Sequence, residues 1–191
     1  MEKEKRKYPG CLHGHSDFSN LRLRDCTNKV DDYIWTAAKM VYNGVALTDH
    51  DSLSGHIKAL KTYEEVKKEY PNFKFLLGNE IYLCRNGLNN ETFESGVDKY
   101  YHFLLIALDV EGHKQLRELS TRAWERSYMA RGMRRVPTYY QDLIDIVGEN
   151  KGHLAATSAC LGSYPGSKLL EFKETRNPQV YNDVESWVQL I

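Results

Sequence analysis

LHGHSDFSNLRLRD (residues 12–25) and VALTDHDSLSGH (residues 45–56) are the stretches that decide how this chain is organised. Each places histidine and aspartate side chains beside a short segment whose composition predicts a β-strand. His13 and His15 are separated by one residue, so an extended strand points both imidazoles to the same face. Two imidazoles side by side are well suited to bind a divalent transition metal.

The same kinds of side chain recur at the ends of other predicted strands. Asp49 and His50 directly follow the apolar run at 45–48, and strand ends are where α/β folds assemble their sites. Three further strand ends each carry one such residue: Glu80 after FLLG, His102 at the start of HFLLIAL, and Cys160 after HLAAT. Because their N, O and S atoms are ligands of zinc, manganese or iron, we expect them to converge on metal.

Each residue taken alone also has an ordinary structural explanation. A His-x-His pair is common at surfaces and in cores, Asp49 could cap a helix, and Glu80 could be a solvated strand end. A buried Cys160 would be a small apolar side chain. The recurrence of these residues at several strand ends favours the metal site, whereas three other histidines show no such pattern: His56, His113 and His153.

Short apolar runs alternate with amphipathic helical segments along the chain, as in α/β folds with a mostly parallel sheet or barrel. The pattern predicts strands at 11–15, 45–48, 73–77, 80–84, 102–108 and 153–157. It predicts helices at 29–42, 54–70, 111–128, 139–147 and, with the apolar face Val184, Trp187, Val188 and Ile191, at 182–191. The segments 85–99 and 129–138 are predicted to be irregular.

The composition fits one globular domain of 191 residues, with 41% hydrophobic and 27% charged residues. Lys and Arg number 26 and Asp and Glu 26, so any contact with DNA requires a local patch such as Arg131, Arg134 and Arg135. No apolar stretch is long enough to span a bilayer, and the first ten residues lack the apolar core of a secretion signal. The four scattered cysteines have no paired spacing, so we expect reduced thiols and a cytoplasmic protein without membrane contact.

These motifs resemble those of the polymerase-and-histidinol-phosphatase (PHP) domain in the bacterial and phage DNA polymerase III alpha subunit family. The motifs at 12–25 and 45–56 are similar to those of all PHP phosphoesterases: His-x-His with a later acid, and Thr-Asp-His after a strand. The resemblance continues from Gly10 to Ser163 through four more segments: LLGNEIYL (76–83), YHFLLIALDVEGHKQLRELSTRAW (101–124), VPTYYQDL (136–143) and TSACLGS (157–163). The sequences LRELSTRAW and TSACLGS favour the polymerase branch of the family.

The resemblance implies a distorted β/α barrel, here incomplete at its C-terminus, with the whole of 1–191 forming one PHP domain at the N-terminal end of a polymerase. It implies two or three divalent ions (Zn, Mn or Fe) once the domain is completed. The implied ligands are His13, His15, Asp25, His50, Glu80, His102 and Cys160. Because the loop is longer than in many relatives, Asp25 is the expected acid of the first motif, and Asp17 is the alternative. Asp49 is expected behind the ligands, where it would fix an imidazole or a loop.

Three functions follow from this resemblance. The first is a metal-dependent phosphoesterase that proofreads the primer terminus as an exonuclease, in contact with DNA, the rest of the polymerase chain and the replisome. The second is a structural module that braces the polymerase or docks a separate proofreading subunit. The third is a free-standing PHP phosphatase. The chain ends before the family's last Asp and His ligands and before any polymerase active site, so we expect no polymerisation by this chain itself.

Overall fold

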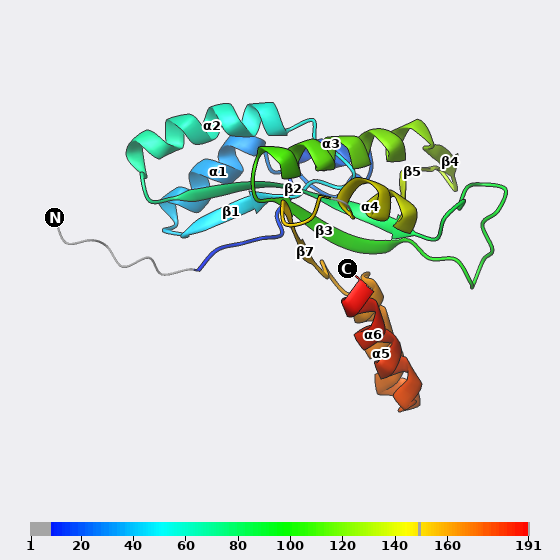
Figure 1. Ribbon diagram of the computed structural model, residues 1–191. Helices are drawn as coiled ribbons and strands as arrows, with labels where there is room; N and C mark the ends of the chain where they lie inside the picture. The colour runs from blue at the N-terminus through cyan, green and yellow to red at the C-terminus, as the bar shows by residue number, and fades with distance from the viewer. Residues whose placement is uncertain (1–8, 149, 191) are drawn as a thin grey trace.

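A mixed five-stranded sheet lies at the centre of the computed structural model, which describes residues 9–148 and 150–190, without the side chains of 187–190 (Figure 1). Its strands are β1 (Gly44–Leu47), β2 (Lys74–Cys84), β3 (Tyr101–Ala107), β6 (Pro137–Tyr139) and β7 (Leu154–Thr157). β1 and β6 run parallel to the two ends of β2, whereas β3 is antiparallel to β2 and β7 is antiparallel to β3. Among the described strands, no pairing joins β7 back to β1, so the sheet forms an open path.

The alternating sequence pattern predicted a mostly parallel sheet, but the observed sheet is mixed. The expectation was wrong because β2 and β3 are joined by a loop, residues 85–100, and not by a crossover helix. Only parallel neighbours need a long crossover, so a direct loop connection allows antiparallel pairing. The structure therefore shows a mixed α/β fold.

Helices cover the sheet and hold the two apolar cores. They are α1 (Val30–Lys39), α2 (His56–Glu69), α3 (Val110–Glu125), α4 (Tyr140–Val147), α5 (Tyr164–Thr175) and α6 (Pro178–Leu190). In Figure 1, α1, α2 and α3 lie along one side of the sheet, whereas α5 and α6 pair with each other and project from the other side.

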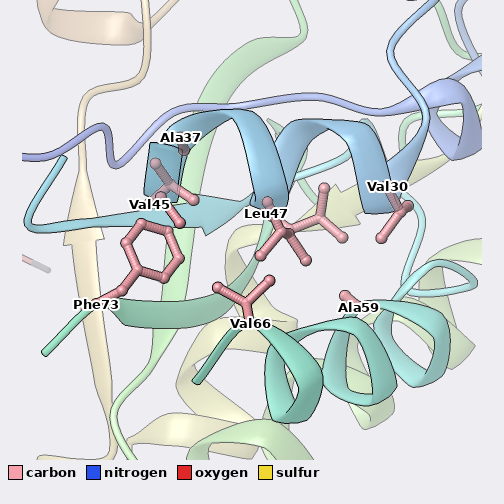
Figure 2. Close-up of a cluster of buried hydrophobic side chains, with 9 residues drawn as sticks. Val30, Ala37, Val45, Leu47, Ala59, Val66 and Phe73 are labelled. Carbon is pink, nitrogen blue, oxygen red and sulfur yellow. The ribbon is translucent and has the colours of Figure 1, made fainter. Parts of the chain in front are cut away.

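One core lies between α1, α2 and the start of the sheet (Figure 2). Its labelled side chains come from three consecutive elements, α1, β1 and α2, and from the turn before β2: Val30, Ala37, Val45, Leu47, Ala59, Val66 and Phe73. A second core joins α3 to the central strands through Leu116, Leu119, Ile81, Leu83, Phe103 and Leu105. These two cores fix the strands whose ends carry the polar motifs.

Most predicted elements are confirmed to within a few residues, but some are wrong. Residues 11–15 are extended without forming a regular strand, since only Cys11 bridges β1 at Val45. The predicted strands 73–77 and 80–84 are one strand, β2, because Gly78 stays in register opposite Ile106. The last predicted helix begins earlier, at Pro178. Of its expected apolar face, the side chains of Trp187 and Val188 and the whole of Ile191 lie outside what the structure describes.

The basic segment 129–138 is also more regular than predicted. β4 (Tyr128–Ala130) and β5 (Met133–Arg135) form a hairpin, and α3 ends before it at Glu125. Arg131 and Gly132 join the two strands with φ of 52° and 74°. Two successive positive φ values are typical of a tight hairpin turn. The helix α5 was not predicted, although Ser163 caps it and Pro165 lies in its first turn.

No helix within 9–148 and 150–190 combines the length and the apolar character that crossing a membrane requires.

His56, at the start of α2, is buried and connects this helix to the sheet. It is 2% exposed, and its Nε2–H donates to the Gly78 carbonyl over 3.1 Å, while its Nδ1 lies 3.0 Å from Nε2 of His113. Burial, reinforced by the nearby His113, lowers the pKa of His56 to about 4. The neutral form is therefore the one that the fold accommodates.

We predict that replacing His56 by Gln makes the unfolding free energy fall less steeply as the pH is lowered from 7.5 to 4. The pKa of His56 is depressed in the folded chain, so its stabilisation is complete above pH 6.5 and is lost as the pH falls towards 4. The loss amounts to roughly 3 kcal/mol of unfolding free energy. Urea unfolding of both chains between pH 7.5 and pH 4 would measure it, and identical slopes for the two chains would contradict the assignment.

Candidate metal centre

Glu80 lies in the middle of β2 and is 1% exposed, yet it is surrounded by imidazoles. Its oxygens are approached by four histidine nitrogens: His13 Nε2 (2.8 Å), His15 Nε2 (3.1 Å) and His50 Nδ1 (3.2 Å) at Oε2, and His102 Nδ1 (2.7 Å) at Oε1. Five side chains from four separate stretches of chain thus meet at one carboxylate.

The sheet brings His50 and His102 to Glu80. Residues 49–51 run beside β2, because the Glu80 amide donates to the Asp49 carbonyl over 3.2 Å and the Asp51 amide donates to the Glu80 carbonyl over 2.9 Å. His102 lies on β3 directly opposite Tyr82. Tyr82 is two residues beyond Glu80 on β2, so the side chains of Glu80, Tyr82 and His102 lie on the same face of the sheet. The positions of these two histidines follow from strand pairing alone.

His13 and His15 are positioned by a close packing of their extended segment on β1. The Thr48 amide donates to the Gly14 carbonyl over 2.8 Å, and the Gly14 amide donates to Thr48 Oγ1 over 3.1 Å. A Cβ atom at Gly14 would lie 2.0 Å from the hydroxyl of Tyr33, so only glycine fits here. His13 and His15 consequently point the same way, with their Nε2 atoms 3.0 Å apart.

The remaining predicted residues lie at the edge of this cluster. Asp25 Oδ2 is 3.0 Å from Nε2 of His50, and Cys160 Sγ is 3.3 Å from Nδ1 of His102. The alternative acid, Asp17, instead forms an ion pair with Lys29 at 2.6 Å. The geometry therefore favours Asp25 as the acid of the first motif.

Asp49 lies behind the cluster, fully buried, and contacts the loop that follows His15. Its carboxylate accepts from the Ser16 amide (2.6 Å), the Ser16 hydroxyl (2.8 Å) and the Ser19 hydroxyl (2.9 Å). The Ser19 Oγ atom is in turn 3.4 Å from Nδ1 of His15 and accepts from the His50 amide over 3.0 Å. Through Ser19, Asp49 is thus connected to the imidazole of His15 and to the backbone of His50.

Sequence analysis missed three side chains around the cluster. Tyr82 Oη is 3.1 Å from Nδ1 of His50, and its spacing of two residues from Glu80 on one strand was the available signal. Arg22 forms a fully buried ion pair with Asp51, Nε to Oδ2 at 3.2 Å, and its guanidinium lies 4.2 Å from the centre of the Tyr82 ring. Neither residue of that pair had a distinguishing position in the sequence.

The electrostatics of the cluster favour an ionised Glu80. Burial alone would raise the pKa of Glu80, but hydrogen bonds from His102, His13 and His15 outweigh it and lower this pKa far below its ordinary range. The hydrogen bond to Glu80 also raises the pKa of His13, whereas burial lowers the pKa of His50. An anionic carboxylate among imidazoles of this kind attracts cations.

The protons available to this cluster cannot satisfy its contacts. His13 Nε2 and His15 Nε2 face each other and also face the same oxygen of Glu80. Each neutral imidazole carries one N–H. If both rings carry it on Nε2, the two hydrogens face each other across the 3.0 Å contact, and if one ring does not, its lone pair faces the carboxylate. A bound cation would resolve that repulsion. The donor set therefore fits a divalent transition metal.

The ligand atoms fall into two groups that share Glu80. His13, His15 and Glu80 form one group, and Glu80, His102 and Cys160 form the other, with the atoms of each group within 4.8 Å of one another. A PHP domain family model matches residues 12–189. This chain belongs to the PHP domain family.

Relatives of this PHP domain include long polymerases. The probable DNA polymerase YorL of Bacillus subtilis strain 168 and the DNA-directed DNA polymerase of Bacillus phage SPbeta are each 46% identical to it over 178 residues. The DNA polymerase III subunit alpha of Aquifex aeolicus is 33% identical over 159 residues. The alignments cover 89%, 89% and 81% of this chain but only 14%, 14% and 12% of these relatives. The PHP domain thus corresponds to a small N-terminal portion of such polymerases.

We predict that replacing Asp49 by Asn destabilises this PHP domain by about 1–3 kcal/mol, because buried donors lose a charged acceptor. Chemical unfolding measures the change. The matched control is Asp31→Asn, which removes an exposed carboxylate paired with Lys58 at 2.8 Å and should shift stability by less than about 0.5 kcal/mol. Equal effects of the two substitutions would contradict the role given to Asp49.

Proposed function

We propose that this PHP domain binds two divalent ions at the Glu80 cluster and hydrolyses phosphodiester bonds of DNA. The observation that supports it most is the sharing of one buried, ionised carboxylate by two ligand groups. Zinc, manganese and iron all suit this mixture of imidazole, carboxylate and thiol. A third ion would need ligands beyond these two groups.

The proposed ligands are those expected from the sequence. His13, His15 and Glu80 would hold one ion, and Glu80, His102 and Cys160 the other. His50 and Asp25, in contact with each other at 3.0 Å, would complete the cluster. Three protein ligands for each ion leave a position open, as catalytic metal sites require.

The chemistry that such ions supply when bound is activation of water and stabilisation of negative charge at phosphorus. The lowered pKa of Glu80 keeps this carboxylate ionised between the two groups at neutral pH. Burial raises the pKa of Tyr82, so its hydroxyl keeps its proton and can donate to Nδ1 of His50. Asp49 and Ser19 hold the first-motif loop against His15 and the backbone of His50. The chain thus orients the ligands through buried hydrogen bonds.

We further propose that residues 1–191 act as one domain at the N-terminal end of a replicative polymerase in the cytoplasm. The 46% identity to polymerases of Bacillus subtilis and its phage SPbeta supports this context. In that context the substrate would be the primer terminus, the reaction would be proofreading, and the partners would be the rest of the polymerase chain and the replisome.

We predict two ions per chain, measured by elemental analysis after dialysis. Glu80→Gln should lose both, because it removes the shared charge, whereas His102→Ala should lose one and keep the ion at His13 and His15. Asp17→Asn is the matched control and should keep both, since Asp17 pairs with Lys29. Absence of any bound zinc, manganese or iron in the wild-type chain would overturn the proposal.

The nuclease activity itself is tested on a 5′-labelled primer with an unpaired 3′ end. We predict metal-dependent shortening, reduced in the His13→Ala, His15→Ala double variant by more than the roughly 10–100-fold typical of residues behind a metal site. Circular dichroism should show that this variant still folds. Loss of folding without any nuclease activity in the parent chain would favour a bracing role for the domain. Turnover of phosphomonoesters alone would favour the small-molecule phosphatase.

A further inference from the structure

A cavity of about 570 Å³ opens beside the metal centre. Its walls come from the segment after β2, residues 90–102, and from the β4–β5 hairpin, which lie at the same end of the molecule (Figure 1). Two of its lining residues, His102 and Tyr82, also belong to the Glu80 cluster. A molecule held in this cavity would therefore lie next to the metal ligands.

Aromatic rings form one side of the cavity. Phe93 and Tyr100 are stacked, with ring centres 6.1 Å apart and planes inclined by 6°, and the Arg135 guanidinium lies 5.3 Å from the centre of the Tyr100 ring. The hydroxyls of Tyr100 and Tyr128 are in contact, which ties the stack to the hairpin. Phe93 ends the stack and is 36% exposed. An exposed ring of this kind offers a surface on which a nucleobase can stack.

Positive charge lines the same cavity. Lys99, Arg131 and Arg135 all contribute to its walls, and none of the three forms an ion pair with a carboxylate of the described residues. The one acid in the lining, Asp98, is engaged by Arg85 at 2.5 Å and 2.9 Å. Because no carboxylate of the described residues pairs with these three cations, the cavity has an excess of positive charge, which favours an anionic ligand.

We infer that this cavity binds the unpaired terminal nucleotide of a single DNA strand. The base would add to the stack that ends at Phe93, and the phosphates would lie near Lys99 and Arg131. Stacking tolerates any base, which suits a site that must accept every terminal nucleotide. The inference rests on the proposed function for one point: the phosphodiester attached to that nucleotide would reach the metal centre beside His102.

The cavity also explains how a chain with zero formal net charge could hold DNA. Arg131 and Arg135 belong to the basic segment that the sequence singled out, and the hairpin turns both of them into the cavity lining. Arg134, between them, does not line the cavity and contacts Ser127 at 3.0 Å instead. Arg134 and Arg135 alternate along β5, so only Arg135 of this pair reaches the cavity, whereas Arg131 reaches it from the turn.

The test measures binding of the metal-loaded chain to a 5′-fluorescein octathymidylate with phosphorothioate linkages at its 3′ end, which resist cleavage. Fluorescence anisotropy should show Phe93→Leu weakening binding by about tenfold, whereas Phe93→Tyr keeps it, because only the aromatic variant can stack. Arg131→Asn suits the positive φ of the hairpin turn and should reduce the slope of log affinity against log salt by about 0.7.

Two controls separate this inference from the proposed function. Arg117→Gln removes an exposed arginine of α3 that does not line the cavity, and should leave both the affinity and the salt slope unchanged. Hydrolysis of bis(4-nitrophenyl) phosphate reports on the metal centre, and Arg117→Gln should hydrolyse it at the wild-type rate. A fully paired duplex of the same length should bind more weakly than the single strand.

Equal affinities of Phe93→Leu, Arg131→Asn and wild type, with hydrolysis of the small diester intact, would overturn the inference and leave the metal-dependent activity standing. Equal binding of duplex and single strand would also overturn it. If the wild-type chain cleaves neither the labelled primer of the nuclease test nor the small diester, but the single strand still binds through Phe93 and Arg131, the proposed function fails and the nucleotide site stands.

Discussion

The burial of one carboxylate constrains the rest of this structure. Glu80 is almost wholly removed from water, and an isolated ionised carboxylate there would be strongly destabilising. The charge is tolerated because His13, His15, His50 and His102 all direct a nitrogen at it. Those four histidines come from segments far apart in the sequence, so placing them requires the whole arrangement of strands around β2. The sheet, the glycine between the first two histidines and the buried Asp49 can all be understood as means of holding this cluster.

The sequence predicted the cluster better than it predicted the fold around it. His13, His50, Glu80 and His102 were identified because each falls at the end of a predicted strand, although Glu80 lies in the middle of β2 and His102 at the start of the antiparallel β3. The mixed sheet was missed because residues 85–100 give no sign of whether the chain crosses over or turns back. Arg22 and Asp51 were missed because a buried ion pair between distant residues leaves no periodic pattern. The β4–β5 hairpin was missed because its turn carries Arg131 where Asn or Gly is usual.

The metal centre and the aromatic cavity are built on shared residues. His102 and Tyr82 contribute to both, so a ligand in the cavity and an ion at Glu80 would sense each other directly. The two regions differ in the exposure of their side chains to solvent. Glu80 and His50 are buried and the other imidazoles around Glu80 are partly buried, whereas Phe93, Lys99 and Arg131 are exposed. A rigid centre beside an accessible basic and aromatic wall is suited to cleaving the end of a flexible strand.

A crystal structure of the manganese-loaded chain, with anomalous scattering recorded, tests the central claim most directly. The account predicts two anomalous peaks on either side of the Glu80 carboxylate, one within bonding distance of His13 and His15 and the other within bonding distance of His102 and Cys160. Peaks only at the protein surface, with Glu80 still hydrogen-bonded to bare imidazoles, would contradict it.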